Sequence, residues 1–381
     1  MSAINSKVKL YNNIFKRKDP LFNTSVKKQR RFINKLSLPV TDIDRSYNQY
    51  LCQKQCNPFF INLFTNIGSF PLYFYFLYLK KNDSLRDKKF VSALFLSPIE
   101  NIKNLPSSLL KEYINLEQEE ISGFYLTKSD KKFIKSISKY HKFSYFFLLK
   151  CILKISVYRS KIMAFNPNAI IVTSEYSFTS SILTLFCNTN NIEHINIMHG
   201  EKLLYIRDSW FHFNRCYVWD DYFINLFNIN KIFCDEYIIE IPDSQKKWHI
   251  ENVNIEFDFT YYLQNQTRKE LMLISDIMKN LKKQGYRVSV RPHPVYSDLK
   301  IINKLFKGIH IEKKSLIIEH SILRTKAVIS LFSTVNRQAY NNNVEYIIDD
   351  ISNKKKYNQL KDLKYYFIEK NHKVLSLYIK N

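Results

Sequence analysis

The chain has 381 residues, of which 45% are hydrophobic and 24% charged, so it is long enough for two domains and is not a disordered protein. Lysine and arginine total 58 against 34 acidic residues, a net charge of +24 that favours anionic partners such as nucleic acid, an anionic leaflet or sugar phosphates. The 5 glycines lie too far apart for a dinucleotide fingerprint, a Walker P-loop or a kinase glycine-rich loop, so a bound phosphate must be held by side chains and helix N-termini.

The N-terminal segment concentrates the positive charge. Residues 1–36 are rich in lysine and arginine, Asp19 is their only acidic residue, and apolar side chains are interleaved among them. We expect a basic arm over residues 1–40 that binds an anionic membrane surface; a solvated, poorly ordered arm and an RNA-binding arm are the alternatives. No RNA-recognition pattern accompanies the arm, so nucleic acid is not an expected partner.

The first half of the chain alternates short β-rich runs with helical runs, which predicts an α/β protein with parallel sheets. The apolar run 67–79 contains Pro71 and is too short to span a bilayer, so core packing is its expected role and an interfacial aromatic face is the alternative. Strands are expected over 90–96, 169–173, 195–198 and 215–219, and helices over 129–160 and 177–187.

The second half repeats the same alternation. Strands are expected over 255–263, 286–290, 327–331 and 344–348, and helices over 268–284 and 335–341. The order of βα units, a crossing and βα units again predicts two Rossmann-like domains that face a central cleft. We place these domains at 41–220 and 221–381.

A stiff basic turn follows the predicted strand 286–290. It reads Arg291-Pro292-His293-Pro294, and its prolines fix the backbone φ angle and hold His293 in one pose. Because ligands bind outside the carboxyl ends of parallel strands, an arginine and a histidine at this point suit phosphate binding. A proline-rich turn with an exposed histidine is the alternative.

Hydroxyl side chains follow the predicted strand 327–331. Ser330, Ser333 and Thr334 lie where that strand ends and the next helix begins, so their hydroxyls and the free backbone N–H groups suit an anion site. An ordinary helix N-cap is the alternative. Together with the His-Pro turn, these residues predict two phosphate-binding corners on neighbouring strands of one domain.

Candidate general bases follow two strands of the first half. His199 comes directly after the strand 195–198 and could take a proton from an acceptor hydroxyl, and Gly200 permits close approach of backbone or substrate. Glu175 occupies the matching place after the strand 169–173 and is a second candidate. A hydrogen-bonded turn residue is the alternative for His199.

The His-Pro turn followed by a hydroxyl pair resembles bacterial sialyltransferases of the two-domain GT-B type. In that family the histidine and the hydroxyl pair hold the CMP part of CMP-sialic acid, and an acidic residue of the N-terminal domain is the general base. The His-Gly segment also resembles capsule-type transferases, including CMP-Kdo transferases and teichoic-acid glycerophosphotransferases. This chain lacks the acidic triplet of the sialyltransferases, and the nearest counterpart is His199-Gly200-Glu201. The base is therefore open between His199, Glu175 and Glu201.

The resemblance also implies a donor site. His293 would contact the CMP phosphate and protonate or stabilise the leaving group, and neighbouring residues would add charge and hydrogen bonds. Those neighbours are Arg291, Pro294, Ser330, Ser333 and Thr334.

The implied function is that of an inverting glycosyltransferase that moves sialic acid from CMP-sialic acid to a sugar hydroxyl of a bacterial surface glycan, such as an O-antigen or capsule unit. No metal and no cofactor besides the CMP-sugar donor are expected. The acceptor would be a lipid-linked or surface glycan, and the enzyme cytoplasmic and peripheral at the inner membrane. The alternatives are a CMP-Kdo transferase, a teichoic-acid-type glycerophosphotransferase and, in a different class, a basic nucleic-acid-binding protein.

Overall fold

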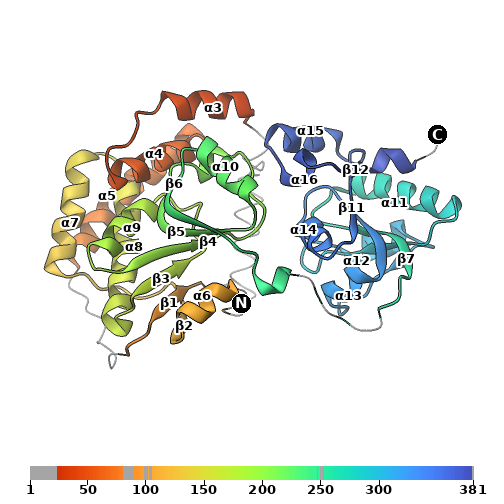
Figure 1. Ribbon diagram of the computed structural model, residues 1–381. Coiled ribbons are helices and arrows are strands. Elements are labelled where there is room, and N and C mark those ends of the chain that lie inside the picture. The colour runs from red at the N-terminus through yellow and green to blue at the C-terminus, as the bar shows by residue number, and fades with distance from the viewer. Residues whose placement is uncertain are drawn as a thin grey trace. The chain divides into compact units, whose positions relative to one another are not determined.

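The computed structural model describes residues 24–79, 89–97, 102, 105–246, 248, 250 and 253–379. The chain divides into two compact units, each with its own sheet and core. Unit 1 contains the described residues up to His199 together with Leu204–Ile241, and unit 2 contains Gly200–Leu203 and the described residues from Pro242 onward. Figure 1 shows unit 1 in red to green and the helices and strands of unit 2 in cyan to blue.

Unit 1 is built on a parallel sheet of six strands in the order β2-β1-β3-β4-β5-β6. The central strands β1 and β3 are short apolar runs, and every residue in them is buried, as is typical of a parallel sheet covered on both faces. The strands are β1 (Ala93–Leu96), β2 (Leu116–Glu119), β3 (Ala169–Val172), β4 (Glu193–Ile197), β5 (His212–Val218) and β6 (Phe233–Ile239).

The helices of unit 1 pack one upon another beside the sheet. Helix α9 packs on β4 and β5, α4 and α8 pack on α9, and α5 and α7 pack on α8 (Figure 1). The helices are α3 (Val26–Lys35), α4 (Asp42–Lys54), α5 (Phe59–Tyr78), α6 (Ser107–Glu112), α7 (Lys128–Tyr140), α8 (Tyr145–Phe165), α9 (Ser180–Asn188) and α10 (Asp221–Ile229).

Unit 2 repeats this design with the strand order β12-β11-β10-β7-β8-β9, again all parallel. Its strands are β7 (Phe257–Tyr262), β8 (Val288–Arg291), β9 (His310–Ile311), β10 (Thr325–Ser330), β11 (Glu345–Ile348) and β12 (Lys373–Val374). Its helices are α11 (Arg268–Lys283), α12 (Leu299–Leu305), α13 (Ile318–Leu323), α14 (Thr334–Asn341), α15 (Lys354–Asp362) and α16 (Tyr366–Glu369).

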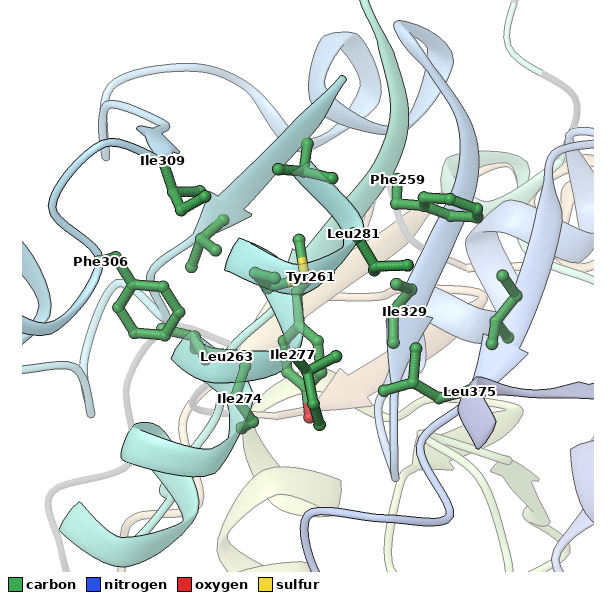
Figure 2. Packing of buried hydrophobic residues seen from close by; sticks show 14 of the residues in the cluster. Phe259, Tyr261, Leu263, Ile274, Ile277, Leu281, Phe306, Ile309, Ile329 and Leu375 are labelled. Carbon is green, nitrogen blue, oxygen red and sulfur yellow. The ribbon is translucent and has the colours of Figure 1, made fainter. Parts of the chain in front are cut away.

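The core of unit 2 lies between α11 and the sheet. Thr267 caps α11 through a capping box with Glu270, and the helix then buries Ile274, Ile277 and Leu281 against the strands (Figure 2). The spacing of these apolar residues is the one that predicted an amphipathic helix.

The predicted α/β class with two Rossmann-like units is confirmed, and each expected strand is present with small shifts at its ends. The boundary between the two units differs from the one predicted from the sequence. We placed it at 220/221, whereas the structure divides the chain at Ile241 and Pro242. The reason is β6, which pairs with β5 along its length and so belongs to unit 1.

Two helical segments differ from expectation. The stretch 129–160 is not one helix, because α7 ends at Tyr140 and α8 begins at Tyr145. Asn66 holds the turn between them, accepting from the N–H of Phe146 and donating to the carbonyl of Phe143. The apolar run 67–79 forms the second half of α5, but it is not chiefly core, since α5 buries only Ser69, Tyr73 and Leu77.

The predicted basic arm is described only in part. Residues 1–23 lie outside the described residues. From Ser25, which caps α3, the chain is helical, and Ile33 of α3 joins a small buried cluster with Tyr205 and Trp210. Among the described residues, no helix has both the length and the apolar content to cross a bilayer.

Candidate functional site

Two neighbouring strands of unit 1 carry Glu175 and His199 to the same edge of the sheet. Glu175 follows β3 and His199 follows β4, and these strands pair directly. The turn after β3 is held firmly: Asn196 of β4 accepts from the N–H of Ser174, and Gln49 of α4 donates to the carbonyl of Glu175. These two hydrogen bonds hold the backbone of the turn that carries the Glu175 side chain.

Glu175 and His199 make a close acid–histidine pair. His199 Nδ1 lies 3.1 Å from Glu175 Oε2, and the backbone N–H of His199 donates to Oε1 at 3.2 Å. The Glu175 side chain is fully buried, whereas 38% of the His199 side chain is exposed. Because an ionised carboxylate only accepts hydrogen bonds, Nδ1 carries the proton and the Nε2 lone pair is left as a base. Glu175 is thus placed to orient His199 and not to meet a substrate itself.

Gly200 and Glu201 continue the chain from His199. Gly200 has a φ of +69°, a left-handed conformation that glycine adopts without strain. Glu201 does not join the acid–histidine pair: its Oε1 accepts from Arg337 Nε at 2.7 Å, and both side chains are buried in unit 2. The Arg337 guanidinium also lies 4.0 Å from the centre of the Tyr366 ring. This buried ion pair corrects the prediction that Glu201 is a candidate base.

In unit 2, His293 is held by the backbone of its own turn. Its Nδ1 accepts from the N–H groups of Val295 at 3.1 Å and Tyr296 at 3.2 Å, and its own N–H donates to Ser297 Oγ at 2.8 Å. Since Nδ1 is an acceptor, the proton of the neutral ring sits on Nε2, which becomes a donor. The Tyr296 ring stacks on the imidazole with centroids 4.5 Å apart.

The charge near His293 comes from a lysine that the sequence analysis did not select. Lys314 Nζ donates to the carbonyl of Pro294 at 3.0 Å. Burial of the ring, with a smaller contribution from the Lys314 charge, lowers the pKa of His293 below its usual value. The ring is therefore neutral near pH 7.

Arg291 was expected to face a phosphate, but its guanidinium is bound inside unit 2. Nη1 lies 3.0 Å from the fully buried Glu312 carboxylate, and Nη2 donates to the carbonyl of Leu316 at 2.7 Å. Arg324 contacts the same carboxylate at 3.2 Å. Arg291 thus neutralises a buried acid, which corrects its predicted role.

The hydroxyl residues at the end of β10 and the start of α14 differ in burial. Ser330 is fully buried and donates to Asn336 Oδ1 at 2.8 Å, so its predicted place among the ligands is also corrected. Ser333 is the N-cap of α14 and accepts from the N–H of Val335 at 3.3 Å, while Thr334 is exposed on the first turn. Only Ser333, Thr334 and the helix N-terminus remain available for an anion.

His293 and the α14 N-terminus share the carboxyl edge of the unit 2 sheet without being on neighbouring strands. β7 lies between β8 and β10, so the strands that end near them are two spacings apart, or about 10 Å. Pro294 is exposed beside His293 and contributes its carbonyl to Lys314. Among the described residues, no three His, Cys, Asp or Glu side chains gather as a metal-ligand set.

Comparison with known proteins gives similarity of fold only. No family model and no curated protein matches the chain. Similar solved structures include the pneumococcal O-GlcNAc transferase GtfA in complex with UDP and GlcNAc, with a TM-score of 0.37 and 11% identity over 55% of this chain and 52% of that one. The chain thus spans about half the length of GtfA.

Two further solved structures align over more of the chain. The glycotransferase of kitacinnamycin has a TM-score of 0.42 and 8% identity over 72% of this chain and 84% of that one. The α/β-galactoside α-2,3-sialyltransferase of the luminous marine bacterium Photobacterium phosphoreum has a TM-score of 0.33 and 10% identity over 76% of this chain and 100% of that one.

Proposed function

We propose that the chain is a glycosyltransferase that moves a sugar from a nucleotide-activated donor to an acceptor hydroxyl. The observation that supports this most is that two histidines at strand ends carry their ring protons on opposite nitrogens. Glu175 accepts a hydrogen bond from Nδ1–H of His199, which leaves Nε2 as a base, whereas two backbone N–H groups donate to Nδ1 of His293, which leaves Nε2–H as a donor. Glycosyl transfer to a hydroxyl can use a general base on the acceptor and a hydrogen-bond donor on the leaving phosphate, and the two histidines match these two roles.

The acid–histidine pair would activate the acceptor. His199 Nε2 removes the proton of the acceptor hydroxyl as its oxygen attacks the anomeric carbon, and the bond from that carbon to the phosphate oxygen breaks. The proton ends on His199, and Glu175 stabilises the imidazolium that forms. Attack opposite the departing phosphate inverts the anomeric centre.

The His293 turn and α14 would bind the departing phosphate. His293 Nε2–H donates to a phosphate oxygen, Lys314 supplies positive charge beside it, and the N-terminus of α14 adds backbone N–H groups next to Ser333. A histidine N–H donor, a lysine and a helix N-terminus can together stabilise the charge of a leaving phosphate without a metal ion.

For the donor we propose CMP-sialic acid, and for the acceptor a sugar hydroxyl of a bacterial surface glycan on a lipid carrier. The choice of CMP rests on the similarity of the His-Pro turn and the hydroxyl pair to bacterial sialyltransferases. The alternatives are CMP-Kdo and CDP-glycerol, which present the same kind of phosphate to the same groups.

A donor screen tests the proposal. The protein is incubated with CMP-sialic acid, CMP-Kdo, CDP-glycerol and UDP-N-acetylglucosamine, with and without EDTA, and release of the nucleotide is followed. We expect CMP release from CMP-sialic acid that EDTA does not reduce and that His199→Ala slows by about 10²-fold or more. Consumption of another donor would replace the donor assignment, and no release from any donor with a range of glycan acceptors would contradict the glycosyltransferase proposal.

A further inference from the structure

Helix α5 presents its apolar side chains to the solvent. Phe59, Phe60 and Phe64 are 72%, 67% and 69% exposed, and Ile67, Tyr75 and Tyr78 are exposed further along the helix. The exposed residues recur along the whole helix at intervals of three and four, so they form a continuous face. A contiguous exposed apolar face of this extent marks an interaction site.

The inner side of α5 is the polar one in its first half. Asn62 donates to the carbonyl of Lys54, Asn66 binds the turn before α8, Thr65 donates to Ile61 and Ser69 to Thr65. A helix that hides amide and hydroxyl groups and exposes phenylalanine reverses the usual pattern of a water-facing helix. Its outer face therefore fits an apolar medium better than water.

Helix α7, which reaches the C-terminal end of α5, carries positive charge. The 20 residues of α5 include no charged side chain. Helix α7 packs on the same helix, α8, and Lys131 donates to the carbonyl of Leu79 just after α5. Lys132, Lys135 and Lys139 of α7 are exposed, whereas its one acid, Asp130, is buried and paired with Arg159.

We propose that α5 docks unit 1 on an anionic lipid bilayer, lying in the interface with its aromatic face among the acyl chains and the α7 lysines at the headgroups. Phenylalanine and tyrosine with flanking lysines are the composition of interfacial helices. The length and composition of α5 also fit this position, because it does not qualify as a spanning helix and Pro71 interrupts its hydrogen bonding.

A second copy of the chain fits this face less well. A symmetric dimer through α5 would bring the α7 lysines of both copies to one interface, where the one acid of these helices, Asp130, is buried and paired with Arg159. An anionic leaflet supplies the missing negative charge. Beside the start of α5, a hollow of ≈ 520 Å³ lined by polar residues that include Lys54, Asn57 and Asn62 offers room for a headgroup.

Vesicle flotation tests the proposal on the full chain. We expect binding to vesicles of phosphatidylcholine with phosphatidylglycerol and little binding to phosphatidylcholine alone. The triple variant Phe60→Gln, Phe64→Gln and Ile67→Gln should bind at least about tenfold more weakly. The matched control, Met272→Gln with Leu377→Gln, removes exposed apolar side chains from unit 2 and should bind like the original chain. Equal binding of triple variant and original, or equal loss in the control, would overturn the proposal.

Two measurements separate docking from loss of folding. Lys132→Glu, Lys135→Glu and Lys139→Glu leave α5 intact and should weaken binding to anionic vesicles by about tenfold or more. Phe64→Trp should show blue-shifted emission and quenching by brominated lipid on anionic vesicles. An unchanged spectrum, or a dimer in sedimentation that the α5 variants dissociate, would instead assign this face to another partner. The proposal is independent of the proposed chemistry, since nucleotide release with a soluble acceptor does not require docking.

Discussion

Unit 1 and unit 2 share one architecture and each places a histidine just beyond a buried strand, yet the two histidines differ in what their Nδ1 atoms meet. A buried carboxylate 3.1 Å away accepts a hydrogen bond from Nδ1–H of His199, and two backbone N–H groups donate to Nδ1 of His293. The same side chain is therefore a base in one unit and a donor in the other. The neighbours, and not the fold or the residue type, decide the role.

Removal of His199 should have the largest effect. His199→Ala should lower kcat by about 10²–10⁴ with a smaller change in KM, because a general base acts in the transition state and contributes little to ground-state binding. The measurement is nucleotide release at saturating donor and acceptor, with circular dichroism to check folding. A kcat within a few-fold of the original chain would remove His199 from the mechanism.

Glu175 and Glu201 lie on either side of His199 in the sequence and offer a matched pair of variants. Glu175→Gln keeps the shape but can present its N–H₂ to Nδ1 and so favour the wrong tautomer, and we expect kcat to fall by about 10². Glu201→Gln instead leaves the buried Arg337 charge without its carboxylate, which should cost unit 2 about 3 kcal/mol of stability.

The assay of this pair combines kcat at saturating substrate with urea unfolding. Glu175→Gln should lose rate more than stability, and Glu201→Gln should lose stability more than rate. The reverse result would exchange the two assignments and make Glu201 the residue that acts on the acceptor.

Removal of the His293 side chain should affect the use of the donor more than the binding of the acceptor. His293→Ala removes the Nε2 donor and should lower kcat/KM for the nucleotide sugar by about 10–100-fold, the loss expected for one hydrogen bond to a charged group. Lys314→Ala should raise the donor KM and reduce its dependence on salt, with a smaller loss of kcat/KM than His293→Ala causes. An effect of His293→Ala confined to the acceptor KM would contradict a donor phosphate at this turn.

The strands that could be predicted are those in the middle of each sheet. Some of them are continuous apolar runs such as Ala169–Val172, whose two faces are both buried, and others keep an apolar segment among polar residues. The four that were missed, β2, β6, β9 and β12, are the edge strands of the two sheets. Edge strands are short or mixed with charge, as in Leu116–Glu119, so their sequences lack the apolar run on which prediction relies.

The site was predictable as far as strand ends locate it. Glu175 and His199 could be paired because consecutive parallel strands end at one edge. The ion pair of Arg291 with buried Glu312 could not be foreseen, because Glu312 follows another strand, β9, and the sequence does not show that the two side chains meet. The sequence did contain a signal for Ser330. It lies two residues after Val328 in the same strand, so both side chains are on one face, and that face packs toward α14.

A further difference between the two units concerns how they respond to acid. His194 of β4 is fully buried in unit 1 and neutral, with Nε2 3.0 Å from Tyr158 Oη and Nδ1 2.8 Å from Thr184 Oγ1. Burial, with a smaller contribution from His212, lowers its pKa to about 3. The unfolded chain, with an ordinary histidine pKa near 6.5, takes up this proton first as pH falls.

The stability contributed by neutral His194 is therefore present above about pH 6.5 and is lost progressively between about pH 6.5 and 3, by up to roughly 1.4 kcal/mol per pH unit. Urea unfolding at pH 7 and pH 5 measures it. His194→Gln should be less stable at pH 7 but lose less on acidification, and unit 1 should unfold before unit 2 at pH 5. An equal pH dependence in variant and original would mean that another group, such as the half-buried His141, whose pKa is also lowered by burial, sets the acid response of unit 1.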